Sequence, residues 1–306
     1  MVQFQLTDDL LNKIADLISA KKNSSLKKIV KDIHFADMAD IINSLNEVQG
    51  IYLIKLFDSE KTSDILTELD ENVREKILKA LSAKEIAVEI KELDSDDAAD
   101  ILGELPDERK DKVISEISDN DLADDLIELL SYEEDSAGGL MAKELVKANE
   151  NWTVLKCLGE IKKQGENVTR VHSIYVVDNN DKLIGRLSLK DLITSQSKKK
   201  IKDIFIPNVD SVNVNQKGEE VAKIMSKYDL EAIPVVNDKK LLLGRITIDD
   251  IVDFIKDEAE EDYLIAAGVQ GDVEADDSIY ELTKARLPWL FLGLIGGLGS
   301  VFILEG

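Results

Sequence analysis

Apolar residues recur every twelve positions along the first 131 residues. The series consists of Leu45, Phe57, Leu69, Leu81, Leu93, Leu105, Ile117 and Leu129, and a second apolar residue stands three positions before each of them. In the first seven units the next residue is Asn46, Asp58, Asp70, Ser82, Asp94, Pro106 or Ser118. Asn, Asp and Ser are preferred helix N-caps, and Pro suits a helix start. Each unit is therefore predicted to be one short helix, and because such helices are marginal alone, residues 1–131 are predicted to stack as an α-solenoid.

The pattern changes after residue 131. Residues 173–177 and 183–187 have the composition of short strands around an Asn-Asn-Asp turn, and helical patterns over 154–163 and 189–195 flank them. The pattern returns 59 residues later, where Ile174, Val176, Val177, Leu183, Gly185, Arg186 and Asp191 match Ile233, Val235, Val236, Leu242, Gly244, Arg245 and Asp250. This internal duplication predicts two β-α-β-β-α modules, over residues 132–199 and 200–252.

A third pattern follows, in which a predicted strand over 241–246 turns at Thr247 into a helix over 249–268. Its apolar residues Ile251, Val252, Ile255 and Ala259 fall on one side, and Asp250, Asp253, Asp257, Glu260 and Glu261 gather on the opposite side. Like charges at this spacing destabilise an isolated helix, and Lys256 is the only basic residue in the stretch. Two interpretations stay open: a solvated acidic face, or a face that holds hard divalent cations.

The end of the sequence has the composition of a membrane span. Residues 287–304 carry no charge, and 18 helical residues cover about 27 Å. Lys284 and Arg286 precede this stretch and favour a cytoplasmic N-terminal side by the positive-inside rule. We therefore expect a linker over 269–286 and a transmembrane helix over 287–306. The predicted fold is multidomain: an all-α helical repeat, two α/β modules, a long acidic helix and one C-terminal transmembrane helix.

Charge excludes one class of partner. The chain has 62 acidic and 38 basic residues and a net charge of −24, which does not suit nucleic acid and attracts cations. Cys157 is the only cysteine, which fits a reducing compartment, and its apolar helical surroundings predict a buried residue. His34 and His172 form no metal pair and are expected to be structural. No nucleophile–base arrangement is evident, so an enzyme is not expected.

One acidic run in the helical repeat differs from the rest. In residues 94–100, Asp96 and Asp100 stand four residues apart on one helical face, with Asp97 beside them and two alanines nearby. An acid at a helix start favours the helix dipole, but Asp100 lies too far along the helix for that benefit. This arrangement suits a metal ion or a basic partner.

The chain resembles the cytoplasmic part of MgtE-type magnesium transporters. The motifs that carry the resemblance are LDSDDAAD (93–100), SYEEDSAGGLM (131–141), SIYVVD (173–178), YDLEAIPVV (228–236), GRITIDDIVD (244–253) and ARLPWL (285–290). The resemblance implies an N domain, a pair of CBS modules and a connecting or plug helix at residues 249–268. It also implies a homodimer formed through the CBS modules, residues 1–286 on the cytoplasmic side of the cell membrane, contact of the last helix with the lipid bilayer, and a pore that lies beyond Gly306.

The resemblance also implies where Mg²⁺ binds. Asp96 and Asp100 correspond to N-domain carboxylates that share Mg²⁺ with Asp250, and Asp229, Asp253 and a backbone carbonyl at Gly138–Gly139 resemble further ligands. The matching acids that bridge the CBS pair and the connecting helix are Glu219, Glu258, Glu261 and Asp262. Lys217 stands where relatives often carry an acid, which predicts a weaker bridging site. Shared carboxylates give weak, switchable Mg²⁺ sites, because this ion prefers oxygen ligands and keeps several waters.

Two other functions remain open at the level of sequence. CBS pairs often bind adenine nucleotides, and Gly185, Ser188, Lys190 and Asp191 fit the ribose-contact signature for ATP in the first module. Ser173 and Leu230 stand where stacking aromatics would be needed, which weakens that prediction. A helical-repeat scaffold similar to the flagellar switch protein FliG, docking a protein partner, is the third alternative.

Overall fold

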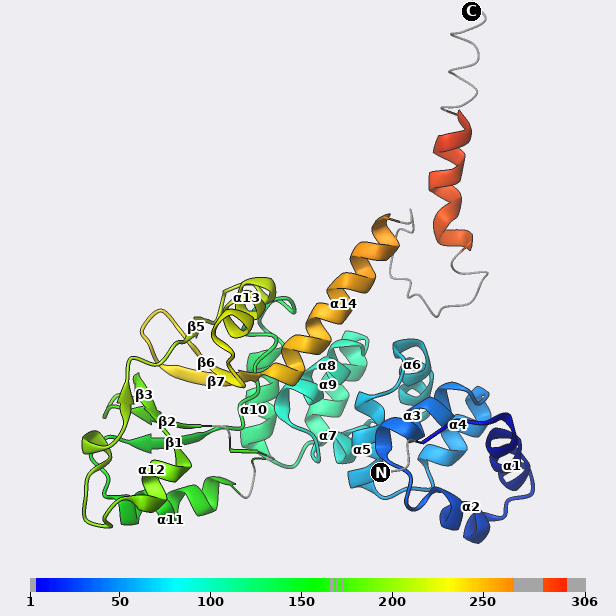
Figure 1. Cartoon of the computed structure of the whole chain (residues 1–306). Helices are drawn as coiled ribbons and strands as arrows, with labels where there is room; N and C mark the ends of the chain where they lie inside the picture. Colours follow the sequence, from blue (N-terminus) through cyan, green and yellow to red (C-terminus); the bar gives the residue numbers. More distant parts are fainter. Residues whose placement is uncertain (1–3, 166–167, 169, 172, 267–282, 296–306) are drawn as a thin grey trace, which may run out of the picture. The chain divides into compact units, whose positions relative to one another are not determined.

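The structure is a computed structural model that describes residues 4–165, 168, 170–171, 173–266 and 283–295 (Figure 1). The chain divides into two compact units. The first contains residues 1–217 and 232–246, and the second contains residues 218–231 and 247–306.

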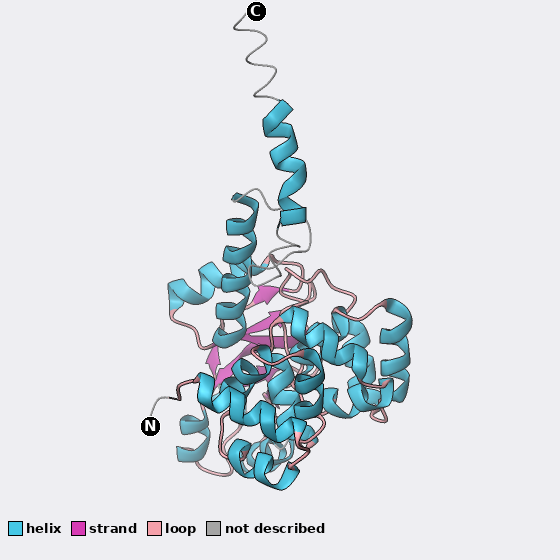
Figure 2. Cartoon of the chain, turned by 90° about the vertical axis from the view of Figure 1, so that its right-hand side faces the viewer, coloured by secondary structure: helices cyan, strands magenta, loops and turns pink. Residues whose placement is uncertain are grey.

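The first unit opens with ten helices, α1–α10, which precede the first strand. Figure 2 distinguishes the helices (cyan) from the strands (magenta). They are α1 (Asp8–Ser19), α2 (Asn23–Val30), α3 (Phe35–Asn43), α4 (Glu47–Ile54), α5 (Ser59–Thr67), α6 (Glu71–Ala80), α7 (Ala83–Ile90), α8 (Ser95–Gly103), α9 (Asp107–Glu116) and α10 (Asn120–Leu129). Helices α3 to α9 each begin twelve residues after the one before, which confirms the predicted repeat. We refer to α1–α10 as the helical array.

In the helical array, a helix packs mainly against the helix two places before or after it in the sequence. Helix α3 packs on α5, α5 on α7 and α7 on α9, while α4 packs on α6 and α8 on α10. The repeating apolar position inside each helix supplies the core: Ile42, Ile54, Leu66, Leu78, Ile90, Leu102 and Leu126 are all buried. The array therefore consists of two alternating rows of short helices.

Most helices of the array begin at the caps that the sequence predicts. Asn46 and Ser82 form reciprocal capping boxes with Gln49 and Glu85. The prediction for the seventh cap is wrong by one residue, because Asp119 and not Ser118 caps α10. The Asp119 Oδ1 accepts from the backbone N–H groups of Asp121 and Leu122, at 3.1 and 3.4 Å, so this residue supplies the cap at the start of α10.

Three cations of the array cap helix C-termini from a distance. The Lys61 ammonium donates to the Val30 and Ile33 carbonyls at 3.0 Å each. Arg74 donates to the carbonyls of Leu66, Thr67 and Leu69, and Arg109 donates to those of Leu78, Lys79 and Leu81. The last carbonyls of a helix lack partners inside the helix, and the dipole favours a cation there.

The first CBS-like module follows the array. Its four-stranded sheet has the order β1-β2-β3-β4. The strands are β1 (Val146–Asn149), β2 (Ile174–Val177), β3 (Leu183–Leu187) and β4 (Ile206–Pro207), with β1 parallel to β2 and the other pairs antiparallel. Helices α11 (Val154–Gln164) and α12 (Leu189–Thr194) and the short 3-10 helix η2 (Ile201–Asp203) complete it. Cys157 is buried in the core of this module, as predicted, and burial raises its pKa to about 11.

A second sheet of three strands also belongs to the first unit. Its order is β5-β6-β7, with β5 (Val212–Asn213), β6 (Ala232–Val236) and β7 (Leu242–Thr247), of which the last residue belongs to the second unit. The linker that follows the array, residues 130–145, joins this sheet before the chain enters β1. The Ala137 N–H donates to the Gln216 carbonyl at 2.7 Å, and Ala142 exchanges both backbone hydrogen bonds with Arg245.

The second unit is helical where it is described. It contains α13 (Gly218–Tyr228) and α14 (Ile248–Ala266), which pack against one another, and a helix over residues 283–295. No helix within the described ranges combines the length and the apolar character needed to cross a membrane. Residues 296–306 of the predicted span lie outside the described residues, so the transmembrane helix stays a prediction.

Candidate metal-binding residues

Helix α8 carries the first predicted pair of ligands. Asp96 lies in its first turn and is half-buried, and its Oδ1 accepts from the Asp97 backbone N–H at 3.0 Å. Asp100 lies one turn later and is exposed. Ala98 and Ala99 between them are buried, so the two carboxylates stand on the side of α8 away from the core of the array.

Gly138 is buried in the linker, and its backbone N–H donates to the Val214 carbonyl at 2.8 Å. A Cβ at this position would lie 2.5 Å from the ring of Tyr132. A Cβ at Gly139 would lie 2.6 Å from the carbonyl oxygens of Glu133 and Glu134. The close approach of the backbone explains why glycine is required at both positions.

Thr247 and Asp250 are hydrogen-bonded to one another at the start of α14. The Thr247 backbone N–H and hydroxyl both donate to Asp250 Oδ2, at 2.9 and 2.6 Å. Asp253 accepts from the Lys256 ammonium at 2.5 Å. Ile251 is buried, but Val252 and Ile255 are 44% and 47% exposed, so most of the apolar side predicted for this helix faces outward within its unit.

The remaining predicted ligands also belong to the second unit. Glu219, in the first turn of α13, forms an ion pair with Lys223 at 2.8 Å, and this hydrogen bond lowers the pKa of Glu219. Asp229 follows α13 in a left-handed conformation, with φ of 51°. Glu258 is half-buried and Asp262 exposed on α14, and of Glu261 only the backbone is described.

The predicted ligands are divided between the two units. Asp96, Asp100 and Gly138 lie in the first, whereas Glu219, Asp229, Asp250, Asp253, Glu258, Glu261 and Asp262 lie in the second. Among the side chains that the structure describes, no group of three or more Asp, Glu, His or Cys residues is arranged to hold a metal ion.

A polar cluster that was not predicted from the sequence joins the array to the linker. Glu144 Oε2 accepts from the Ser95 backbone N–H at 3.1 Å and from the Ser95 hydroxyl at 2.8 Å. The Arg245 Nε–H donates to the Glu144 carbonyl at 2.5 Å, and the Arg245 guanidinium lies 3.7 Å from Asp94 Oδ2. Lys143 donates its backbone N–H to the Ser95 hydroxyl and its ammonium to Glu128, both at 2.8 Å. These contacts surround the residue that begins α8, one position before Asp96.

Lys217 contacts the linker over residues 130–145 near its first residues. Its ammonium lies 2.8 Å from both Glu133 Oε2 and Asp135 Oδ2. The hydrogen bonds that the Lys217 ammonium donates to the carboxylates of Asp135 and Glu133 raise the pKa of Lys217. The cation at position 217 thus neutralises two linker carboxylates.

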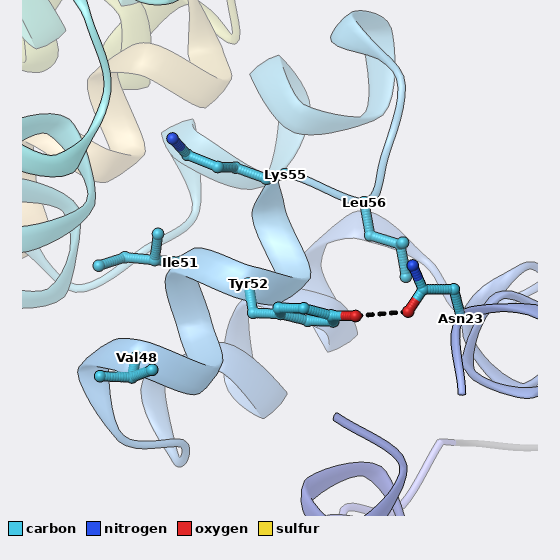
Figure 3. Close-up of a pocket in the computed structure, with 6 residues that line it drawn as sticks. All are labelled: Asn23, Val48, Ile51, Tyr52, Lys55 and Leu56. Atoms are coloured by element: carbon cyan, nitrogen blue, oxygen red, sulfur yellow. Dashed lines mark hydrogen bonds between the residues drawn. The ribbon is translucent and has the colours of Figure 1, made fainter. Parts of the chain in front are cut away.

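The predicted nucleotide residues form a helix cap in the first module. The Ser188 hydroxyl donates to Asp191 Oδ2 at 2.7 Å and accepts from the Asp191 backbone N–H at 3.0 Å, while Lys190 is exposed on α12. A shallow groove of about 390 Å³ lies elsewhere, between α2 and α4, where the Tyr52 hydroxyl donates to Asn23 (Figure 3). Its lining contains none of the predicted site residues.

His34 has the structural role expected of it. It is the N-cap of α3, and its Nδ1 accepts from the Ala36 backbone N–H at 3.3 Å. His172 lies outside the described residues.

Comparison with known proteins agrees with this architecture. Residues 33–135 match the family described as the MgtE intracellular N domain, and residues 137–198 and 201–257 match the CBS domain. The chain is 30% identical over 301 residues to the magnesium transporter MgtE of Bacillus subtilis (strain 168), which covers 97% of this chain. The chain belongs to the MgtE family. It is also 37% identical over 178 residues to MgtE of Enterococcus faecalis (strain ATCC 700802 / V583), which covers 58% of this chain.

The fold is that of a solved MgtE fragment. The crystal structure of the cytosolic domain of the Mg²⁺ channel MgtE in complex with ATP has a TM-score of 0.74 and 28% identity, and covers 80% of this chain and 99% of that one. The chain spans 66% of the length of the Bacillus MgtE and 39% of the Enterococcus MgtE.

Proposed function

We propose that this chain is the Mg²⁺-sensing and gating region of a magnesium transporter or channel in the cell membrane. Membership of the MgtE family supports Mg²⁺ as the transported ion. The composition of α14 supports the sensing role. That helix carries eight acidic residues and one basic residue in its 19 positions. Carboxylates repel one another unless cations lie between them, and oxygen donors alone suit Mg²⁺. The acid-rich helix is the observation that carries the proposal.

In this proposal Mg²⁺ binds between carboxylates that belong to different parts of the chain. Asp96 and Asp100 of α8 share ions with Asp250, and Asp229, Asp253 and the Gly138 carbonyl add ligands. Glu219, Glu258, Glu261 and Asp262 bridge the CBS pair and α14. High Mg²⁺ favours a compact, closed state because that state binds more cations than the open one. At low Mg²⁺, repulsion among the carboxylates weakens the compact state and opens the gate.

The proposed assembly is a homodimer formed through the CBS modules. Exposed apolar side chains on α11 and α12 support it: Leu155, Leu158, Leu189 and Ile193 are all exposed. Residues 1–286 lie on the cytoplasmic side of the membrane in this arrangement, and residues 287–306 form the first span. The proposed parts are the N domain (1–131), the CBS modules (132–199 and 200–252), the connecting helix (249–268) and a linker (269–286).

The decisive experiment is a double-mutant cycle on Asp100 and Asp250 in the full chain, with Mg²⁺-induced protection from protease as the readout. Each single change to Ala is expected to raise the Mg²⁺ midpoint about tenfold, which corresponds to 1.4 kcal/mol. The double variant is expected to be little worse than either, because both residues would serve one ion. Full additivity, or unchanged midpoints in both single variants, contradicts the shared site.

Nucleotide sensing is the second candidate. A similar cytosolic domain was solved in complex with ATP, and Ser188 and Asp191 lie at the matching signature. Charge also favours it: residues 143–202 contain 13 basic and 7 acidic residues, a net +6 within a chain of net −24. Titration with ATP should protect this module, and Asp191→Ala should remove that protection. An ATP titration without effect leaves the magnesium function standing and excludes this addition.

A further inference from the structure

A groove interrupts the alternating packing of the helical array at its first helices. Helix α4 packs on α1, α3 and α6, whereas α2 packs on α1 and is not among the main packing partners of α4. The groove of about 390 Å³ lies between α2 and α4, beside the contact of Tyr52 with Asn23 (Figure 3). A second depression of about 580 Å³, between the end of α1 and the start of α4, is also lined by Val48 and Tyr52. Because the two depressions share these residues, we treat them as one site, the α4 groove.

The floor of the α4 groove is apolar and accessible. Val48 is 76% exposed, and Ile51, Tyr52 and Leu56 are half-buried. Among the described residues that line the groove, only Glu47 is acidic. Val48 and Tyr52 stand one helical turn apart on α4, so their side chains form a stripe along that helix. A groove of this kind accepts the apolar face of a second helix, whose residues at i, i+3, i+4 and i+7 fill it.

A group of lysines lies beside the groove. Residues 21–31 contain five lysines and no acidic residue, in a chain of net charge −24. All five are exposed, and none forms an ion pair with another residue that the structure describes. Lys21 lines the groove, as does Asn23 at the start of α2, and Lys27 and Lys28 lie about 6–8 Å further along α2, within one Debye length. These lysines, which we call the lysine patch, give one side of the groove a positive potential. The patch consists of Lys21, Lys22, Lys27, Lys28 and Lys31.

The groove and the patch together define the chemistry of a partner. A basic rim favours an acidic ligand, and an apolar floor favours a ligand with an apolar face. A nucleic acid or a flat anionic lipid surface would contact the lysines but leave the floor uncovered. A second copy of the chain is not the expected occupant, because the apolar side chains that support the proposed dimer lie on α11 and α12.

We propose that the α4 groove and the lysine patch form a docking site for an acidic amphipathic helix of a partner protein. The apolar face of that helix covers Val48 and Tyr52, and its carboxylates lie against the lysine patch. The site consists of residues of the helical array alone and needs no Mg²⁺. It therefore goes beyond the proposed function and does not depend on it.

The test uses a fluorescein-labelled peptide of about 18 residues, long enough to form a helix, with leucines on one face and glutamates elsewhere. Fluorescence anisotropy measures its binding to the full chain in chelator and at low salt, so that no Mg²⁺ bridges carboxylates and charges are little screened. A second peptide carries glutamine in place of every leucine and therefore has the same charge. Because the chain is strongly acidic, it repels either peptide except at a basic surface.

The contribution of charge is measured by reversing two lysines of the patch. The double variant Lys21→Glu, Lys27→Glu should weaken binding of the leucine peptide about tenfold, because attraction becomes repulsion at both positions. The matched control is Lys198→Glu, Lys199→Glu, which reverses two exposed charges in the basic stretch of the first CBS module and should leave the affinity unchanged.

The contribution of the apolar floor is measured in the protein and in the peptide. Val48→Asp should weaken binding of the leucine peptide about tenfold, because a charge replaces an apolar contact. Val88→Asp, at an exposed position of α7 outside the groove, is the matched control and should bind as wild type does. The glutamine peptide should bind the wild-type chain about tenfold more weakly than the leucine peptide, a comparison that requires no change in the protein.

Four results overturn the docking site. The first is a leucine peptide that does not bind the wild-type chain at about 100 μM. The second is equal weakening by the variants and their controls. The third is equal binding of the two peptides, which would assign the lysines to a polyanion such as nucleic acid or lipid headgroups. The fourth is a change of oligomeric state in Val48→Asp by light scattering, which would assign the groove to a second copy of the chain.

Discussion

Thr247 binds a single oxygen of Asp250 twice, through its backbone N–H at 2.9 Å and its hydroxyl at 2.6 Å. Ser188 and Asp191 form the corresponding pair in the first module, 59 residues earlier. The Gly–Ser/Thr–Asp spacing that the two modules share therefore stabilises the start of a helix, whether or not a ligand binds there. Any cation that binds Asp250 would meet a carboxylate already oriented by Thr247.

Comparing variants at these two positions separates the cap from the metal ligand. Asp250→Ala and Thr247→Ala should each destabilise the start of α14 by about 1 kcal/mol, the usual effect of a lost cap. Only Asp250→Ala should also raise the Mg²⁺ midpoint of compaction, about tenfold under the proposed function. Thermal unfolding in chelator measures the first effect and protease protection the second. Equal midpoints for the two variants would reduce Asp250 to a capping residue.

Glu85 and Glu89, one turn apart on α7, should respond to pH in opposite directions. Burial raises the pKa of Glu89, so the folded state binds its proton more tightly than the unfolded state. The stability attributable to Glu89 is therefore lost as the pH rises from its ordinary value of 4.5 through the folded pKa. Glu89→Gln should make the protein more stable than wild type at pH 7 and equal to it below the ordinary value, since glutamine can still accept from Ser59.

Glu85→Gln is the control with the reverse sign. The hydrogen bond from the Ser82 backbone lowers the pKa of Glu85 in the capping box of α7. Its contribution is present above the ordinary value of 4.5 and is lost as the pH falls through the folded pKa. Glu85→Gln should therefore be less stable than wild type at pH 7. Urea unfolding between pH 4 and pH 8 gives both differences, and the same sign for both variants would contradict the assignment.

Lys217 should govern how firmly the linker is held. Lys217→Met leaves Glu133 and Asp135 near each other without their shared ammonium, which should raise the rate of protease cleavage within residues 132–136. The three side chains are exposed, so the ion pairs are weak, and salt should weaken the effect further. Lys223→Met, which removes a lysine bound to a single glutamate on α13, is the matched control. Equal cleavage rates in the two variants at low salt would exclude a clamp at Lys217.

The proposed dimer can be tested at the exposed apolar side chains of α11 and α12. Leu155 on α11 and Ile193 on α12 are 67% and 63% exposed. A Leu155→Asp, Ile193→Asp double variant should be monomeric at micromolar concentration by light scattering, because a charge in a buried apolar interface is costly. Val48→Asp, at an even more exposed position on α4, should leave the dimer intact. A monomeric wild-type chain, with and without Mg²⁺, would refute the dimer.

Local periodicity made the helical array predictable. Each helix of α3–α9 begins where the twelve-residue pattern places it, because the cap and the core residue of each unit lie a few positions apart. Strands β2 and β3 of the first module and helix α11 were predictable for the same reason: short-range alternation and flanking turns determine them. Ser118 and Asp119 are both suitable N-caps and are adjacent in the sequence. The twelve-residue pattern predicted Ser118, whereas Asp119 is the N-cap of α10.

The contacts around Ser95 could not be predicted, because they join residues that are distant in the sequence. Ser95 and Glu144 are 49 residues apart, and Glu144 and Arg245 are 101 apart. Arg245 stood inside a motif that carried the family resemblance, yet nothing in the motif indicated that the arginine is buried. Its counterpart in the duplication, Arg186, is exposed, so the repeat itself suggested the opposite. Burial of a single charge depends on what other segments bring to it.

The two-row packing of the helical array constrains how its length can change. Since a helix packs on the one two places further along, removing one unit of twelve residues would move every later helix into the opposite row. The cations that reach back to cap earlier helices, such as Lys61 and Arg74, would then face the wrong helix ends. Removing two consecutive units, about twenty-four residues, preserves both the rows and the direction of each cap. Insertions and deletions that the array tolerates, in nature or by design, should therefore come in pairs of helices.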